Sequence, residues 1–424
     1  MNRVESGANR NFMITKTVRV LTEATGLLRA PQRVIPFFSK LASDELRTTF
    51  EYRHLYSYAA TIIPTADALR SVVSWMRDAQ RPDGGIAAYY SLLTGYSESY
   101  PEVTGYIIPT LYDFDRMAGD SAARKSVERA THWLLSLQMP SGAFPGGLRG
   151  RDRDAQSSVF NTGQILQGLV RAHAETKEAE ILKCAVAAGD WLAAIQEADG
   201  SWTGPAAYQG TSHTYYSMVS WALSQLADES GNQRHAGAAD RNITWVLAHV
   251  RPSGWIEGIN LQGHPAYLHF IAYVIQGILE CGILRRRDDA IQAAAKSAWV
   301  LLRKFETYKR LLGTYQPDFK GGHRFSCLTG NAQMSCVWLR LFEVTGDLRY
   351  LNAALKMNEM LKQSLPAKGR HGVLGGVAGS YPIWGRYQPM RFISWGNKFL
   401  ADALMLEQRL MREFETKLEA SECA

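Results

Sequence analysis

The sequence predicts an all-α protein, an (α/α)6 barrel or toroid in which six helical hairpins form an inner and an outer ring. Tryptophans recur at intervals of 58, 58, 54 and 54 residues, at Trp75, Trp133, Trp191, Trp245 and Trp299. A second motif occurs six times. Its first copy is Val-Thr-Gly-Tyr around Thr104, and altered copies follow at Thr162, Thr214, His269, Thr329 and Trp395. A repeat of 50 to 60 residues indicates an array of supersecondary units.

Each unit contains two helices with different surfaces. The first helix ends in Trp and Gln, as in residues 66–80, and carries charged residues on one face, so it belongs to the outer ring. The helix after the second motif is apolar on most sides, as in residues 218–223, and belongs inside. Outer-to-inner connections are about twenty residues long and rich in Gly, Pro, Tyr and Trp. Because long loops in a compact domain are usually functional, we expect the active face at their end of the ring.

The chain divides into three parts. Residues 1–50 are predicted to be a helical extension and linker, residues 51–410 the toroid, and residues 411–424 the end of the last helix and a tail. Charged residues interrupt any apolar run near the N-terminus, so no signal peptide or membrane span is predicted and we expect a cytoplasmic protein. Because residues 18–38 are basic, a peripheral contact with the inner membrane or with a biosynthesis complex stays an alternative.

The composition limits the classes of partner that the protein is expected to bind. The net charge of +7 and a pI near 9.1 favour an acidic partner. The basic residues form no long run with interleaved aromatics, so nucleic acid is not expected. The five cysteines show no metal-binding spacing and are predicted to be buried free thiols, and neither a metal nor a cofactor is expected.

Several motifs resemble a known family. They are Gln80-Arg-Pro-Asp-Gly-Gly, Ser99-Tyr-Pro-Glu-Val-Thr-Gly-Tyr-Ile-Ile-Pro-Thr, Phe160-Asn-Thr-Gly-Gln, Leu328-Thr-Gly-Asn-Ala-Gln and Ser380-Tyr-Pro-Ile-Trp-Gly. Across about residues 50–410 the chain resembles a bacterial family found with exopolysaccharide biosynthesis genes. That family is similar in fold to six-hairpin glycosidases and to the terpenoid-cyclase/prenyltransferase toroids. The resemblance implies the fold and a polysaccharide context, but it assigns no catalytic residue.

The starts of the inner helices supply the candidate catalytic residues. Proton abstraction next to a sugar carboxylate needs a base, an acid and a group that neutralises the carboxylate. We therefore expect β-elimination or C5-epimerisation of a uronic acid in an acidic polysaccharide, with catalysis by His213, His269, Tyr106, Glu102 and Tyr215.

Amide, aromatic and charged residues nearby are candidates for substrate binding. Amides would bond sugar hydroxyls, and aromatic faces would stack on sugar rings. The candidates are Asp83, Tyr100, Asn161, Gln164, Tyr216, Trp255, Asn331, Gln333, Tyr381, Trp384 and Lys398.

Three alternatives stay open. A glycoside hydrolase would pair Glu102 with a loop carboxylate such as Asp83, Glu257 or Asp318. A non-catalytic glycan-binding or scaffold protein would keep the aromatic residues without acid and base. A terpenoid cyclase is less well supported, because the sequence has no acidic DxDD motif, and the zinc ligands of a prenyltransferase are also absent.

Overall fold

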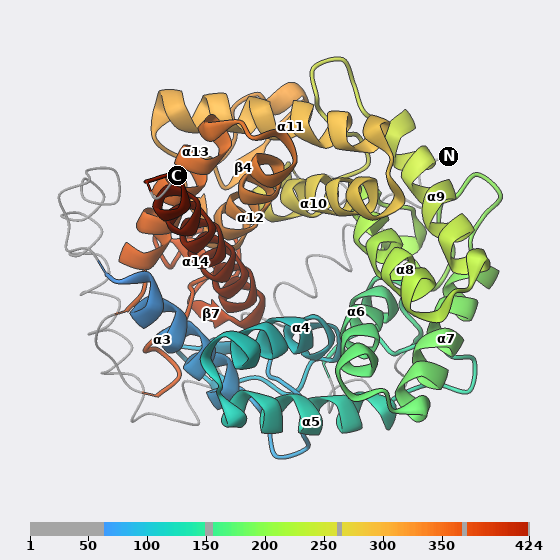
Figure 1. Ribbon diagram of the computed structural model, residues 1–424. Helices are drawn as coiled ribbons and strands as arrows, with labels where there is room; N and C mark the ends of the chain where they lie inside the picture. The colour runs from blue at the N-terminus through green and yellow to red at the C-terminus, as the bar shows by residue number, and fades with distance from the viewer. Residues whose placement is uncertain (1–62, 149–155, 261–264, 367–370, 423–424) are drawn as a thin grey trace.

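The computed structural model describes residues 63–148, 156–260, 265–366 and 371–422, and there it confirms the predicted (α/α)6 toroid (Figure 1). The inner ring consists of α4 (Pro101–Ala118), α6 (Val159–Thr176), α8 (Ser217–Ser230), α10 (Leu268–Arg285), α12 (Leu328–Thr345) and α14 (Ser394–Glu422). The outer ring consists of α3 (Thr65–Asp78), α5 (Ser121–Leu135), α7 (Ala179–Ala194), α9 (Gln233–Ala248), α11 (Asp288–Tyr308) and α13 (Leu348–Gln363). The predicted extension 1–50, with its basic stretch 18–38, lies outside the described residues, and the domain boundaries stay predictions.

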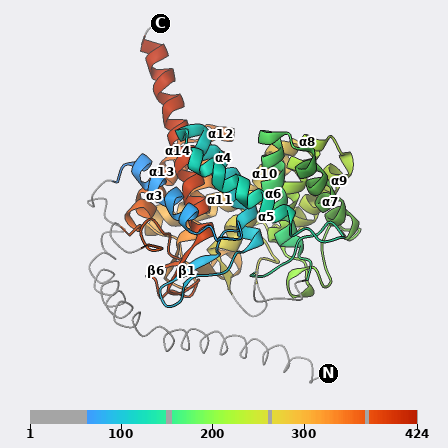
Figure 2. The same cartoon turned by 90° about the horizontal axis from the view of Figure 1, so that it is seen from below.

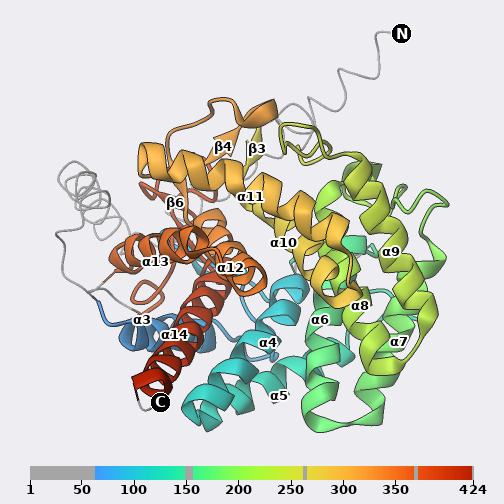
Figure 3. The same cartoon turned by 45° about the horizontal axis from the view of Figure 1, so that its top comes forward.

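The inner helices close into a ring because each packs on the next. The last one, α14, packs against α12 and also against α3 and α4 at the start of the array (Figure 3). Among the described helices, only α10 is long and apolar enough to cross a membrane by length and composition, and 78% of that window is buried. Its place in the inner ring explains this apolar character.

A recurring glutamine explains the regular spacing of the outer helices. The Gln80 amide donates to the carbonyl of Gly84 in its own turn (2.9 Å) and to that of Ser126 in the next outer helix (2.8 Å). Gln138 repeats this arrangement with Gly142 and Cys184, and Gln196 repeats it with Gly200 and Ala238. The repeated sequence pattern therefore encodes a repeated contact between neighbouring hairpins.

The long connections gather on one side, which we call the loop face (Figure 2). They contain the short strands and 3-10 turns β1 (Tyr89–Ser91), β2 (Gly95–Tyr96), η2 (Tyr208–Gly210), η3 (Thr214–Tyr216), β3 (Ala266–Tyr267), β4 (Thr314–Tyr315), η4 (Pro317–Phe319), β5 (Ser326–Cys327), β6 (Ser380–Tyr381) and β7 (Arg391–Ile393). Strand β1 pairs with β2 and, antiparallel, with β7; β3 pairs with β4 and β5 with β6. The β1–β7 pair joins the first connection to the last.

Two motif threonines, Thr104 and Thr162, lie inside their helices rather than at the N-cap position. Helix α4 begins at Pro101 and α6 at Val159, with Ser158 accepting a hydrogen bond as the N-cap of α6. Thr104 lies inside α4, where its hydroxyl accepts from the backbone N–H of Ile86 (2.8 Å), and Thr162 accepts in the same way from Phe144 (3.0 Å). These threonines fasten the preceding loop to the inner helix.

We expect Thr104→Val to destabilise the protein by about 1 to 3 kcal/mol, because the buried N–H of Ile86 would lose its partner. Urea unfolding measures this change. Thr94→Val, at an exposed loop position, is the control and should cost much less. Equal losses for the two variants would contradict the fastening role.

The four described cysteines are buried free thiols, as predicted. Burial raises the pKa of Cys184 to about 12 and is the first cause of the raised pKa of Cys281, Cys327 and Cys336. These thiols therefore behave as core residues rather than nucleophiles.

Candidate functional site

Glu102 is the carboxylate at the centre of the polar residues below the loop face. It lies in the first turn of α4, directly after Pro101. The Tyr100 hydroxyl donates a 2.6 Å hydrogen bond to Glu102 Oε2. Protein atoms enclose the carboxyl group, while the residue as a whole is partly exposed. Glu102 is therefore a largely desolvated carboxyl at the start of an inner helix.

Burial sets the protonation of Glu102. Desolvation raises the pKa of its carboxyl from 4.5 to about 7, and the hydrogen bond from Tyr100 opposes this only in part. A carboxyl with a pKa near 7 exchanges its proton readily at neutral pH, which suits a general acid or base.

Five phenols surround this carboxyl. Burial is the first cause that raises the pKa of each, and the charge of Glu102 is a further cause for all five: Tyr100, Tyr106, Tyr215, Tyr273 and Tyr387. They are therefore protonated hydrogen-bond donors at neutral pH. These five tyrosines, Glu102 and His269 are called the aromatic site below.

His269 enters the aromatic site from the first turn of α10. Its Nδ1 contacts Gln333 Oε1, and Gln333 Nε2 donates to Gln276 Oε1 (3.4 Å). Because Gln333 Oε1 accepts, Nδ1 carries the proton and Nε2 keeps its lone pair. Burial lowers the pKa of His269 to about 3, so the ring is neutral. It packs against Tyr273, with ring centroids 4.2 Å apart, and against Tyr387.

His213 is held by the loop instead. Its Nε2 lies 3.0 Å from the carbonyl oxygen of Tyr208, and its ring stacks on Tyr215 with centroids 4.9 Å apart. Burial is the main cause that lowers its pKa. The backbone N–H of Tyr208 donates to the Tyr216 hydroxyl (2.8 Å). His213 and Tyr216 therefore fix the loop around Tyr215, and of the two predicted catalytic histidines we keep His269 for the proposal below.

Buried side-chain amides also occur in the first two turns of the inner helices α6 and α12. Gln164 is fully buried and neither its amide oxygen nor its nitrogen has a hydrogen-bond partner; Asn331 Oδ1, on α12, is also unpaired. The Asn161 amide lies near the Tyr100 hydroxyl and shares a hydrogen bond with Ser158. Unpaired buried amides are costly, so they favour a ligand with hydroxyl groups over a hydrocarbon.

The remaining candidates lie elsewhere. Asp83 accepts from the N–H of Gly85 and the Ser99 hydroxyl, which explains it as a turn residue. Trp255 is 2% exposed and packs on Phe319, so it offers no stacking surface. Lys398 binds Asp402 (2.6 Å) and lines a cavity deeper in the ring, while its ammonium also lies 5.8 Å from the ring centroid of Tyr106.

Two loop aromatics keep exposed surface near the mouth. Tyr381 is half-buried in β6, and Trp384 is 36% exposed. They stay candidates for contacts with a longer ligand. The loop carboxylates Glu257 and Asp318 are exposed and both bind Arg251. Neither is therefore placed as a second carboxyl beside Glu102.

Three aromatic residues of this region were missing from the sequence prediction. Phe160 packs edge-on against Tyr215 and Tyr273, and Phe270 stacks on Tyr215. Tyr273 follows His269 by four residues, so the helical repeat alone places both on one face of α10. That spacing was the available signal. In the described residues, no group of three or more His, Cys, Asp or Glu side chains is placed to hold a metal.

The raised pKa of Glu102 predicts a pH-dependent stability. A carboxyl with a folded-state pKa above its unfolded value stabilises the fold below about pH 4.5, and this contribution is lost as the pH rises through 7. The wild-type protein should lose roughly 3 kcal/mol relative to Glu102→Gln between pH 4.5 and pH 8. Urea unfolding of both proteins at these two pH values measures the difference. A constant difference would show that the carboxyl is not desolvated.

The fold belongs to a class of α/α toroids that includes carbohydrate enzymes. The structure is similar to cellobiose 2-epimerase from Spirochaeta thermophila, with a TM-score of 0.66, 15% identity, and 82% of this chain and 96% of that one covered. For unsaturated glucuronyl hydrolase from Bacillus sp. GL1 the TM-score is 0.63 and the identity 15%, with 80% of this chain and 96% of that one covered. For an unsaturated glucuronyl hydrolase specific for heparin the TM-score is 0.67 and the identity 15%, with 82% of this chain and 98% of that one covered. At these identities the likeness shows the fold alone.

Sequence comparison gives different relatives from structure comparison. Residues 99–278 match the family model of the squalene-hopene cyclase C-terminal domain, a stretch that begins just before Glu102 and ends in α10. Drimenyl diphosphate synthase from Streptomyces showdoensis is 26% identical over 242 residues, which cover 56% of this chain. The aligned part spans only 40% of that relative.

Proposed function

We propose that this protein is a carbohydrate-active enzyme that moves a proton at a sugar ring bound in the aromatic site. The observation that carries the proposal is the enclosed Glu102 carboxyl, with a pKa of about 7 and a hydrogen bond from Tyr100. The unpaired amides of Gln164 and Asn331 support a hydroxyl-rich substrate. The toroid fold shared with sugar epimerases and glucuronyl hydrolases is compatible with this assignment.

The arrangement suits β-elimination or C5-epimerisation of a uronic acid in an acidic, exopolysaccharide-type glycan. The lone pair on Nε2 of the neutral His269 takes the proton from the carbon next to the sugar carboxylate. The protonated form of Glu102, which is present near pH 7, supplies a proton in return, to the opposite face of that carbon in epimerisation or to the departing oxygen in β-elimination. The phenols stabilise the negative charge that develops on the carboxylate. Hydrolysis is less well supported, because it needs a second carboxyl about 5 to 10 Å away and the candidate loop carboxylates are bound by Arg251.

Incubation with a panel of uronate glycans tests the proposal. Absorbance of unsaturated sugar ends reports elimination, deuterium uptake at C5 reports epimerisation, and new reducing ends report hydrolysis. We expect a signal in one of the first two. Binding without any of these signals would leave a glycan-binding or scaffold protein and overturn the enzyme proposal.

A second candidate is protonation of an alkene, as in an isoprenoid cyclase. The matches to the squalene-hopene cyclase domain and to drimenyl diphosphate synthase favour it, and buried aromatic faces around a protonated carboxyl could stabilise a carbocation. Incubation with squalene and with isoprenyl diphosphates, followed by mass spectrometry of cyclised products, distinguishes it. A cyclised product would replace the carbohydrate assignment.

Tyr100→Phe should shift the pH profile of the reaction to higher pH. The Tyr100 hydrogen bond lowers the pKa of Glu102, so its removal leaves burial unopposed and raises that pKa above about 7. The midpoint of the profile moves upward whether Glu102 acts as acid or base. Tyr96→Phe, at a half-buried tyrosine of β2, is the control. An unchanged midpoint in Tyr100→Phe would show that Glu102 does not control the step.

A further inference from the structure

A second cavity opens on the face opposite the loop face. It has a volume of about 630 Å3 and is lined by residues from all six inner helices. Small-molecule sites in proteins have about this size. Tyr106 of the aromatic site stacks on Phe399, with ring centroids 6.1 Å apart, and the ammonium of Lys398, which lines the cavity, lies 5.8 Å and 4.3 Å from these two rings. We call it the basal cavity.

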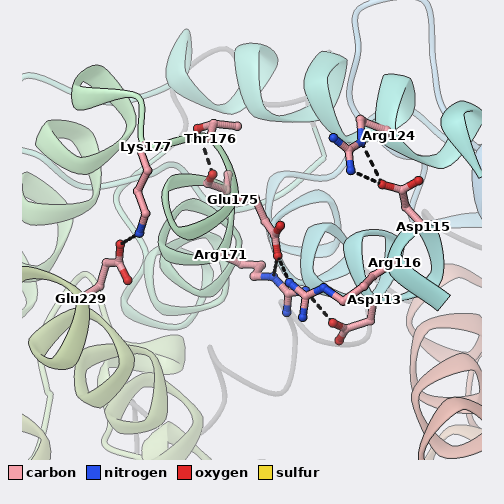
Figure 4. A network of polar contacts seen from close by, with 10 residues as sticks. Asp113, Asp115, Arg116, Arg124, Arg171, Glu175, Thr176, Lys177 and Glu229 are labelled. Carbon is pink, nitrogen blue, oxygen red and sulfur yellow. Dashed lines mark hydrogen bonds and ion pairs between the residues drawn. The ribbon is translucent and has the colours of Figure 1, made fainter. Parts of the chain in front are cut away.

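Six basic and three acidic side chains line the basal cavity, and five of the basic ones form ion pairs. Arg171 of α6 binds Asp113 of α4 (2.6 Å), and Figure 4 shows this pair with its neighbours. Arg340 of α12 binds Glu280 of α10 (2.8 Å) in the equivalent way. Because each guanidinium is held by a carboxylate on the preceding inner helix, both groups keep fixed orientations. Carboxylates just outside the lining bind Arg116 and Arg409 as well, so most of the positive charge is compensated.

Neutral polar side chains complete the lining. Gln167 is 5% exposed and its Nε2 has no hydrogen-bond partner, and Gln225 Oε1 is also buried and unpaired. Both line the cavity, one offering a donor and the other an acceptor. These unpaired atoms call for a ligand that can accept and donate hydrogen bonds.

One aromatic side chain lines the same wall. Trp221 of α8 is half-buried and borders the cavity. An indole face complements the apolar face of a sugar ring. The combination of a tryptophan, three glutamines and mostly paired charges is suited to hydroxyl groups rather than to an ion or a hydrocarbon. The third glutamine, Gln276, is the end of the chain that runs from His269 through Gln333.

We propose that the basal cavity is a second saccharide site, which binds one or two neutral sugar rings through Trp221 and the glutamines. This site is separate from the aromatic site and does not depend on the reaction at Glu102. It would allow a sugar unit to be held on the face of the ring away from the long loops.

Fluorine NMR of the full chain labelled with 5-fluorotryptophan tests this site, with the Trp221 resonance assigned by Trp221→Phe. Cellobiose is the neutral probe, glucuronate the charged one, and n-octanol the hydrocarbon control. We expect cellobiose to shift the Trp221 resonance in a saturable manner. Gln167→Leu should weaken this binding about tenfold. Gln408→Leu, on α14 but outside the lining, should leave it unchanged.

The same titration with Glu102→Gln separates this proposal from the proposed function. The Trp221 shift should persist in that variant even though turnover is lost. Failure of cellobiose to shift Trp221 up to its solubility would overturn the second site, and so would a shift produced by glucuronate or octanol alone. An undiminished affinity in Gln167→Leu would also overturn it. None of these results bears on catalysis in the aromatic site.

Discussion

Glu102→Gln should lower turnover by about 10²- to 10⁴-fold, the usual contribution of a positioned acid or base. The amide has nearly the shape of the carboxyl and can still accept the Tyr100 hydrogen bond, but it cannot carry the proton at neutral pH. Substrate affinity should change much less, because the aromatic walls and the amides of Gln164 and Asn331 remain. Turnover is measured in whichever channel of the glycan panel reports activity, with affinity measured by calorimetry.

Glu98→Gln is the matched control, since Glu98 is an exposed carboxylate in the loop just before α4. It should retain wild-type turnover. If Glu102→Gln lost less than a factor of ten, the proton would be handled by another group, and His269→Gln would become the informative variant. If both carboxyl variants lost activity equally, the effect would come from the loop rather than from proton transfer.

The fold could be predicted because both the residue types and the spacing of its repeat recur along the sequence. Gln80, Gln138 and Gln196 make the same two bonds in successive hairpins, so the residue type and its spacing are both fixed. Closure of the loop face could not be predicted in this way. It depends on pairing Tyr89–Ser91 with Arg391–Ile393, two short segments almost a whole chain apart that carry no local pattern.

The sequence prediction of the site agrees with the proposed site only in part, for physical reasons. Glu102 was predicted because a carboxyl at the start of an apolar inner helix is expected at one end of the ring, and its role stays a prediction. His213 lies one residue before the motif position that His269 occupies, and its ring nitrogen is used by a carbonyl of its own loop, which only the folded loop reveals. Lys398 was expected at the mouth, whereas the partner Asp402, one helical turn further on, holds it at the basal cavity.

Gly105→Ala should destabilise the protein by about 3 kcal/mol, although Ala normally favours a helix over Gly by about 1 kcal/mol. A Cβ on Gly105 would lie 2.4 Å from the Cα of Ile165, and one on Gly168 would lie 2.2 Å from the carbonyl oxygen of Gly105. Helices α4 and α6 thus meet backbone to backbone, and neither can yield by rotating a side chain. The added methyl must push the two helices apart three residues beyond Glu102, so turnover should fall together with the free energy of unfolding.

Gly237→Ala supplies the control for Gly105→Ala, because the substitution is identical and the site is also inside a helix. In α9 the added Cβ would meet only the end of the flexible Arg241 side chain, at 3.6 Å. This variant should therefore gain about 0.5 to 1 kcal/mol, and the two substitutions should differ in sign in urea unfolding. A gain for both would mean that α4 and α6 are further apart than the structure shows. The position of Glu102 relative to Asn161 and Gln164 on α6 would then have to be revised, since that distance depends on the same helix contact.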